Sequence, residues 1–271
     1  MSVLDSFAAL CVSKATREVY AIALETKANQ CTMYVTCNGT PPKSLEVYLQ
    51  YIKNQILQIG LAVVPTDPDE SIEVPFSATT QTLTFDLLMK CHKHGMKKIR
   101  RRLEKQKANY DTYMDKLRQD ARSVDTMLHE KLCQFQDHLN EVAKIFKTKL
   151  SDDFMATMIV HHAPLFSKYL KEGSSELRLL QVLHEKFDEY TVLSMASFLI
   201  FAYLFSVPVS HGFSMQRFFK KLFTHYTAAM NVVSLAGSVC FRPLLKSHFT
   251  IVLVPEEHHT VSFPVRGQAV C

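Results

Sequence analysis

Residues 96–146 read MKKIRRRLEKQKANYDTYMDKLRQDARSVDTMLHEKLCQFQDHLNEVAKIF. They belong to a longer run, Met96–Ala163, that contains neither glycine nor proline. Because these two residues are the strongest helix breakers, their absence favours long helices. Eleven apolar residues of the run recur at steps of three and four that average 3.6, the period of an α-helix. They are Tyr110, Tyr113, Leu117, Ala121, Val124, Leu128, Leu132, Phe135, Leu139, Val142 and Phe146.

This apolar seam, residues 110–146, predicts one long helix with a single apolar face. An unbroken helix from Met96 to Leu150 would be about 80 Å long. The rest of one compact domain does not easily cover such a length. We therefore expect the seam to dock another helix, from a second protein or from a second copy of this chain, in a non-enzymatic interaction protein of coiled-coil type.

Positive charge is concentrated at the start of the same stretch. The chain has 31 lysines and arginines and 26 acids, and within residues 97–107 Glu104 is the one acid among seven bases. These candidate site residues are Lys97, Lys98, Arg100, Arg101, Arg102, Lys105 and Lys107. On a helix these basic side chains would cover the whole circumference except the sector occupied by Met96, Ile99 and Leu103. Such a surface suits nucleic-acid phosphates, anionic lipid or a nuclear import signal, and the sequence alone does not choose between these uses and a solvated helix end.

The rest of the chain predicts a mainly α protein with small β elements. The runs Glu18–Glu25 and Gln30–Cys37 alternate apolar and polar residues, which indicates a β-hairpin. A helix follows, in which Gly60 ends the apolar run Leu45, Tyr48, Leu49, Ile52, Ile56 and Ile59. Near the C-terminus, Phe249–Val254 and Thr260–Val265 predict a short second hairpin. We expect an α/β module over residues 1–62, an acidic, proline-containing linker over 63–80, and a helical body with the terminal hairpin over 81–271.

Residues 191–209 form an uncharged and mostly apolar segment, TVLSMASFLIFAYLFSVPV. Its length is close to the roughly 20 residues that cross a bilayer as a helix. A fully buried core helix has the same composition, and Pro208 and several serines favour that alternative. A membrane-anchored protein that uses residues 191–209 as a transmembrane helix therefore stays open as a second hypothesis.

Motifs for catalysis, cofactors or metals are incomplete. His129-Glu130 and His184-Glu185 begin an H-E-x-x-H pattern that no second histidine completes. Cys91, His92 and His94 lie close together, but no partner motif completes a zinc site. The sequence thus indicates no catalytic residue, metal ligand or cofactor.

The cysteine pattern and the N-terminal residues bear on the compartment. Seven cysteines are scattered along the chain, odd in number and never spaced as C-x-x-C, which indicates reduced thiols. The N-terminal residues do not form a secretory signal. We therefore expect an intracellular protein, cytoplasmic or nuclear, or alternatively one associated with a membrane.

The opening residues also resemble a group of fungal proteins. Residues 4–56 read LDSFAALCVSKATREVYAIALETKANQCTMYVTCNGTPPKSLEVYLQYIKNQI. They are similar in style to the N-terminal region of uncharacterised proteins from mushroom-forming fungi, many of which carry a deaminase-like zinc domain further on. A zinc deaminase needs an H-x-E motif and a later P-C-x-x-C motif. Neither occurs in this chain, so the resemblance implies no deaminase residue and no deaminase activity here.

Overall fold

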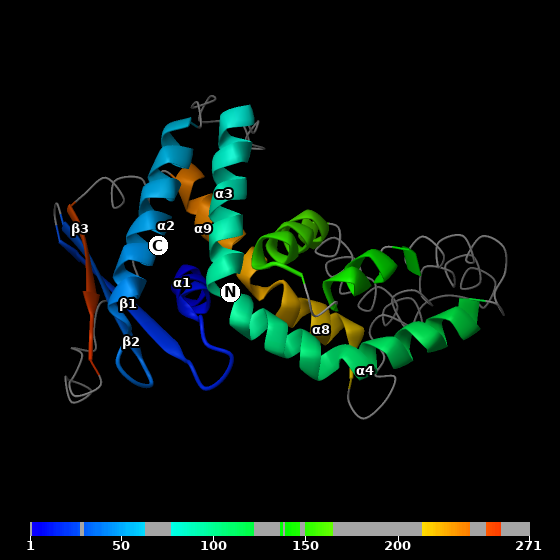
Figure 1. Cartoon of the computed structure of the whole chain (residues 1–271). Helices are drawn as coiled ribbons and strands as arrows, with labels where there is room; N and C mark the ends of the chain where they lie inside the picture. The colour runs from blue at the N-terminus through cyan, green and yellow to red at the C-terminus, as the bar shows by residue number, and fades with distance from the viewer. Residues whose placement is uncertain are drawn as a thin grey trace, which may run out of the picture. The chain divides into compact units, whose positions relative to one another are not determined.

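The computed structural model contains helices and one small sheet (Figure 1). It describes residues 2–27, 30–62, 77–121, 136–137, 139–146, 150–164, 213–238 and 248–255. Most of these residues are helical, and three strands form the sheet. The predicted fold class, mainly α with a small N-terminal β-hairpin and helix module, is therefore confirmed.

The chain divides into two compact units. The first, here called the sheet unit, comprises residues 1–87 and 228–271, and the second, the helical unit, comprises residues 88–227. Each boundary falls inside a helix, α3 (Ala78–His94) or α9 (Thr224–Gly237). Among the described residues, 228–238 and 248–255 fall in the same unit as residues 1–62, and α3 begins inside residues 63–80, the predicted linker. Residues 63–76 of that linker lie outside the described part of the chain.

The sheet unit contains a hairpin and one distant strand. Strands β1 (Tyr20–Lys27) and β2 (Gln30–Cys37) pair antiparallel, as the alternating pattern predicts. Strand β3 (His248–Leu253) lies on the other side of β2 and runs parallel to it. The first arm of the predicted C-terminal hairpin is thus a strand, but it pairs with β2, more than 200 residues earlier in the sequence. The second arm, 260–265, lies outside the described residues.

Helices α1 (Val3–Cys11) and α2 (Lys43–Ala62) lie on one side of the sheet (Figure 1). The strand register places Leu24, Met33 and Ile251 in one row across a single face. The apolar residues of α2 that the sequence predicts as its inner face are all buried: Leu45, Tyr48, Leu49, Ile52, Ile56 and Ile59. Helix α2 continues past Gly60 to Ala62, and a Cβ at Gly60 would lie 3.1 Å from the carbonyl oxygen of Ala236. The absence of a Cβ at this position allows α2 and α9 to pack closely.

The helical unit has its own apolar core. Helix α4 (Met96–Ala121) contributes Met96, Ile99 and Leu103, which the sequence predicts as the apolar sector, and all three are buried. Helix α8 (Met215–Leu222) is preceded by the N-cap Ser214, whose side chain accepts a hydrogen bond from the Arg217 backbone N–H. It buries Met215, Phe218, Phe219 and Leu222 in the same core. A third contribution comes from the helical residues 152–164, which follow the N-cap Ser151.

The prediction of one unbroken helix from Met96 to Leu150 is wrong. The hydroxyl of Tyr110 donates a hydrogen bond to the carbonyl oxygen of Leu139, at 2.6 Å. On a continuous helix these residues would be about 43 Å apart. Tyr110, Tyr113, Leu139 and Val142 all lie in the same buried core, so the described part of the seam packs against itself. The side chains of the other seam residues lie outside the described set.

Candidate nucleic-acid interface

The seven bases of residues 97–107 all lie on α4, in the helical unit. The helix presents its apolar face to the core through Met96, Ile99 and Leu103, so the bases occupy the remaining circumference. Lys97, Arg101, Lys105 and Lys107 are exposed, whereas Lys98, Arg100 and Arg102 are half-buried. The structure therefore separates the predicted site into a solvent-facing group and an inner group.

Arg100 connects α4 to the start of the helical residues 152–164. Its Nε and Nη2 atoms donate to Oδ1 of Asp152 at 2.9 and 2.6 Å, and Nη2 also donates to the carbonyl oxygen of Leu150 at 2.6 Å. Seven residues earlier in the chain, near the end of α3, Lys93 forms an ion pair with Asp153. Both acids stand in the first turn of residues 152–164, where negative charge also favours the helix dipole. We infer that Arg100 mainly joins α4 to this helix.

Arg102 holds α8. Its guanidinium donates a hydrogen bond to the carbonyl oxygen of Lys221, in the last turn of α8. The final carbonyl groups of a helix have no partner inside the helix, so a cation there both bonds them and offsets the negative end of the dipole. Burial lowers the pKa of Arg102 from its usual value. Arg102 is therefore a structural residue in the helical unit.

The exposed bases of α4 follow the helical repeat. Lys97, Arg101 and Lys105 are spaced four residues apart, so they lie along one side of the helix at intervals of about 6 Å. Glu104 is exposed on the same part of the helix, and Asp111 follows one turn beyond Lys107. The surface is thus strongly positive over residues 97–107 and loses this character further along α4.

Helix α8 carries three basic residues outside the predicted site, residues 97–107. Arg217, Lys220 and Lys221 are exposed, and the other described side chains of the helix are buried. The α8 helix packs beside α4, through Arg102 and through the rings of Tyr110 and Phe218, whose centroids are 5.8 Å apart. The mixture of basic residues with Phe218 and Phe219 in the sequence is typical of an amphipathic helix and could have identified α8. Its placement beside residues 97–107, more than 100 residues away, had no signal in the sequence.

The histidines near the start of α4 form no recognisable metal centre. His92 is fully buried in α3, with Nδ1 2.7 Å from the carbonyl oxygen of Leu88, and its ring centroid lies 6.4 Å from that of His225. Burial lowers the pKa of His92 to about 4, although the bond to Leu88 acts in the opposite direction. Among the described residues, no three or more His, Cys, Asp or Glu side chains gather in a way that could hold a metal ion.

The segment proposed as a membrane anchor, residues 191–209, lies outside the described residues. Within the described ranges, no helix combines the length and the apolar character needed to cross a bilayer. The membrane hypothesis for residues 191–209 therefore stays a prediction.

Comparison of the chain with protein-family models, with curated proteins and with solved structures gives no match. The similarity of residues 4–56 to fungal proteins therefore stays a prediction.

Proposed function

We propose that this chain is a nucleic-acid-binding protein that contacts phosphates through the exposed bases of α4. The observation that carries the proposal is the row Lys97, Arg101 and Lys105, which is exposed along a helix whose opposite face is fixed in the core. The row spans about 12 Å, the axial length of three to four phosphates on one strand of B-DNA. Contacts of this kind bind by charge and release counterions, so they are independent of base sequence.

The composition of this surface favours nucleic acid over an anionic membrane. Helices that lie on membranes place large apolar side chains beside their bases and insert them among the lipids. The exposed large apolar residues of the described structure are Val19, Val47, Leu61, Phe85 and Phe154. None of them belongs to α4 or α8. A charged surface without an apolar anchor suits a soluble polyanion.

The alternative of docking a protein on the seam 110–146 has less support. Its motivation was a long apolar face without a covering surface. Tyr110, Tyr113, Leu139 and Val142 cover one another within the chain, so this part of the seam needs no partner. The basic surface of α4 keeps its exposed charges and is the better candidate.

The proposal is tested with a triple variant, Lys97→Gln, Arg101→Gln and Lys105→Gln. We expect its affinity for a mixed-sequence 30-base-pair DNA duplex to fall roughly tenfold or more at 0.1 M salt. The slope of log K against log salt concentration should become shallower by about 0.9 for each lost phosphate contact. Fluorescence anisotropy titrations between 50 and 200 mM salt measure both quantities.

A matched control removes the same charge from the sheet unit. Arg17, Lys27 and Lys43 are exposed there, and their triple change to glutamine should leave the affinity and the salt slope close to those of the unchanged protein. Equal losses in both triple variants would show a response to net charge alone and would refute a site on α4. Binding of anionic phosphatidylserine vesicles in preference to DNA would favour the membrane instead.

Arg100→Gln separates the inner bases from the exposed ones. Because Arg100 bonds Asp152 and Leu150 inside the helical unit, we expect the free energy of unfolding to fall by about 1–2 kcal/mol. The salt slope of DNA binding should change little. Urea unfolding and the same anisotropy titration measure the two effects, and a slope reduced as much as in the α4 triple variant would place Arg100 among the contact residues.

A further inference from the structure

We propose that α8 supplies a second row of phosphate contacts, and that the ligand is double-stranded nucleic acid held by its backbone. This inference rests on the proposed function, because it extends the same surface. The second row consists of Arg217, Lys220 and Lys221, which are exposed on a helix without acidic residues.

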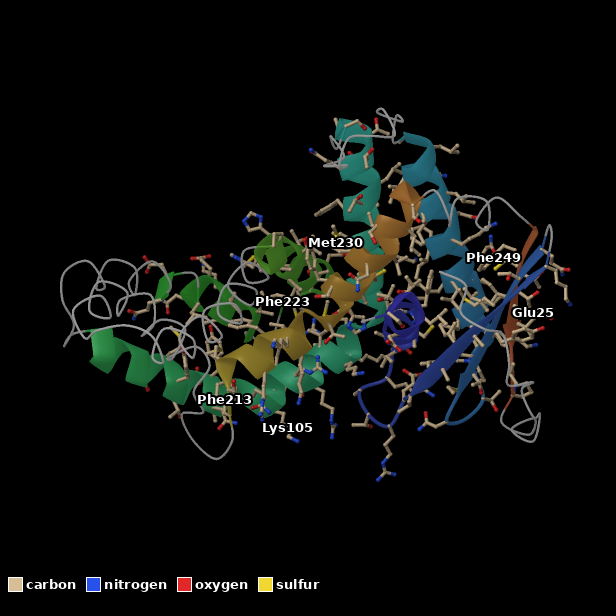
Figure 2. The ribbon with its side chains drawn as sticks, turned by 180° about the vertical axis from the view of Figure 1, so that it is seen from behind. Glu25, Lys105, Phe213, Phe223, Met230 and Phe249 are labelled. Carbon is tan, nitrogen blue, oxygen red and sulfur yellow. The ribbon has the colours of Figure 1, made fainter. Side chains whose placement is uncertain are left out.

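The two rows adjoin because of the way in which α8 packs. Arg102 and Arg100 lie on opposite flanks of α4: Arg102 bonds the end of α8, and Arg100 bonds residues 150 and 152. At 100° per residue, Lys105 is about 60° around the helix from Arg102, toward solvent. Lys105 therefore lies on the flank of α4 that borders α8; Figure 2 labels Lys105 on α4 and Phe213 just before the start of α8.

The helices run in opposite directions. Residue 102 of α4 contacts residue 221 of α8, whereas residue 110 contacts residue 218. Both helices direct their apolar residues into one core, so both direct their bases toward solvent. Packed helices have axes about 8–10 Å apart. Two basic rows at such a separation can contact both phosphate strands of a duplex, whereas one row contacts a single strand.

The aromatic residues of this region indicate that the protein does not recognise the nucleobases of its ligand. Proteins that bind single strands stack the unpaired bases on exposed aromatic rings. Here Tyr110, Tyr113, Phe218 and Phe219 are all buried in the core, and neither helix exposes a described aromatic side chain. A duplex needs no such platform, because its bases already stack on one another.

The test is a second triple variant, Arg217→Gln, Lys220→Gln and Lys221→Gln. These side chains are exposed, and the bond from Arg102 goes to the main-chain carbonyl of Lys221, so the core and this contact are retained. Circular dichroism and thermal unfolding confirm the fold. We expect the salt slope for the 30-base-pair duplex to become shallower by about 2–3. A single strand of the same sequence should bind the unchanged protein more weakly than the duplex, and a duplex of another sequence should bind equally well.

The outcomes separate this inference from the proposed function. If the α8 variant keeps the full salt slope while the α4 variant loses it, the second row is refuted and the function stands. If neither variant differs from the control triple in the sheet unit, both proposals fail. Tighter binding of the single strand than of the duplex would overturn the assignment of the ligand. A strong dependence on duplex sequence would overturn recognition through the backbone.

Discussion

Replacing Gly95 with alanine is expected to lower the free energy of unfolding by about 3 kcal/mol, at the upper end of what overpacking a core usually costs. Gly95 joins α3 to α4. A Cβ atom at this position would lie 2.8 Å from Cδ2 and Cε1 of His225 and closer still to Nε2. The His225 ring is only 1% exposed, so the surrounding core prevents it from swinging away. Chemical denaturation at neutral pH measures the loss.

Gly237→Ala provides the matched control for this prediction. A Cβ at Gly237 meets nothing within 4 Å, so we expect a change of less than about 0.5 kcal/mol, as for most surface substitutions. The double change Gly95→Ala with His225→Ala should cost less than the sum of the two single changes, because the smaller side chain leaves room for the added methyl group. Strict additivity of the two single changes would contradict the steric explanation.

The unfolding free energy is expected to depend on the protonation of His92. Its pKa is lowered to about 4 by burial, whereas in the unfolded chain it is about 6.5. Above pH 6.5 the ring is neutral in both states. Between pH 6.5 and 4 the unfolded chain binds the proton and the folded chain does not, so stability decreases as the pH falls. The full difference corresponds to about 3 kcal/mol.

Urea unfolding at pH 7 and at pH 4 measures this effect, with His92→Gln as the comparison. Carboxylates with lowered pKa values, such as Glu18, also lose stabilising contacts in acid, so the unchanged protein alone does not isolate the histidine. We expect the variant to lose about 3 kcal/mol less than the unchanged protein between the two pH values. An equal loss in both proteins would show that His92 is protonated in the folded state at pH 4.

The bases of α4 differ in what they contribute to the molecule. Arg102 and Arg100 bond to groups on two neighbouring segments, Lys221 and Asp152, and so help to fix α4 in place. Lys97, Arg101 and Lys105 remain exposed. A helix held on both flanks presents its exposed charges in a fixed row, which reduces the entropy lost when a polyanion binds. The half-buried arginines thus support the surface without belonging to it.

Local pattern was sufficient for several parts of the fold. The β-branched and aromatic alternation of residues 20–37 gives the β1–β2 hairpin, and the helical spacing of residues 45–59 identifies the buried face of α2. The apolar sector Met96, Ile99 and Leu103 was found in the same way. Each of these features depends on residues close together in the chain, whose periodicity reports which side chains face inward.

Long-range packing could not be predicted from the same patterns. A period of 3.6 residues shows that the seam has an apolar face, but it does not show what covers that face, and a straight helix and two packed segments have the same periodicity. The contact of Tyr110 with Leu139 and the pairing of β3 with β2 both depend on burial between residues far apart in sequence.

Neighbouring residues are enough to predict the helical character of this protein, its β-hairpin and the basic segment 97–107. Which of the seven basic side chains face solvent, and the position of Arg217, Lys220 and Lys221 beside them, follow from the packing of the folded chain. The segments that pack around a charged side chain leave it exposed at the surface or bury it in an internal hydrogen bond. Those segments come from parts of the chain that no local period connects.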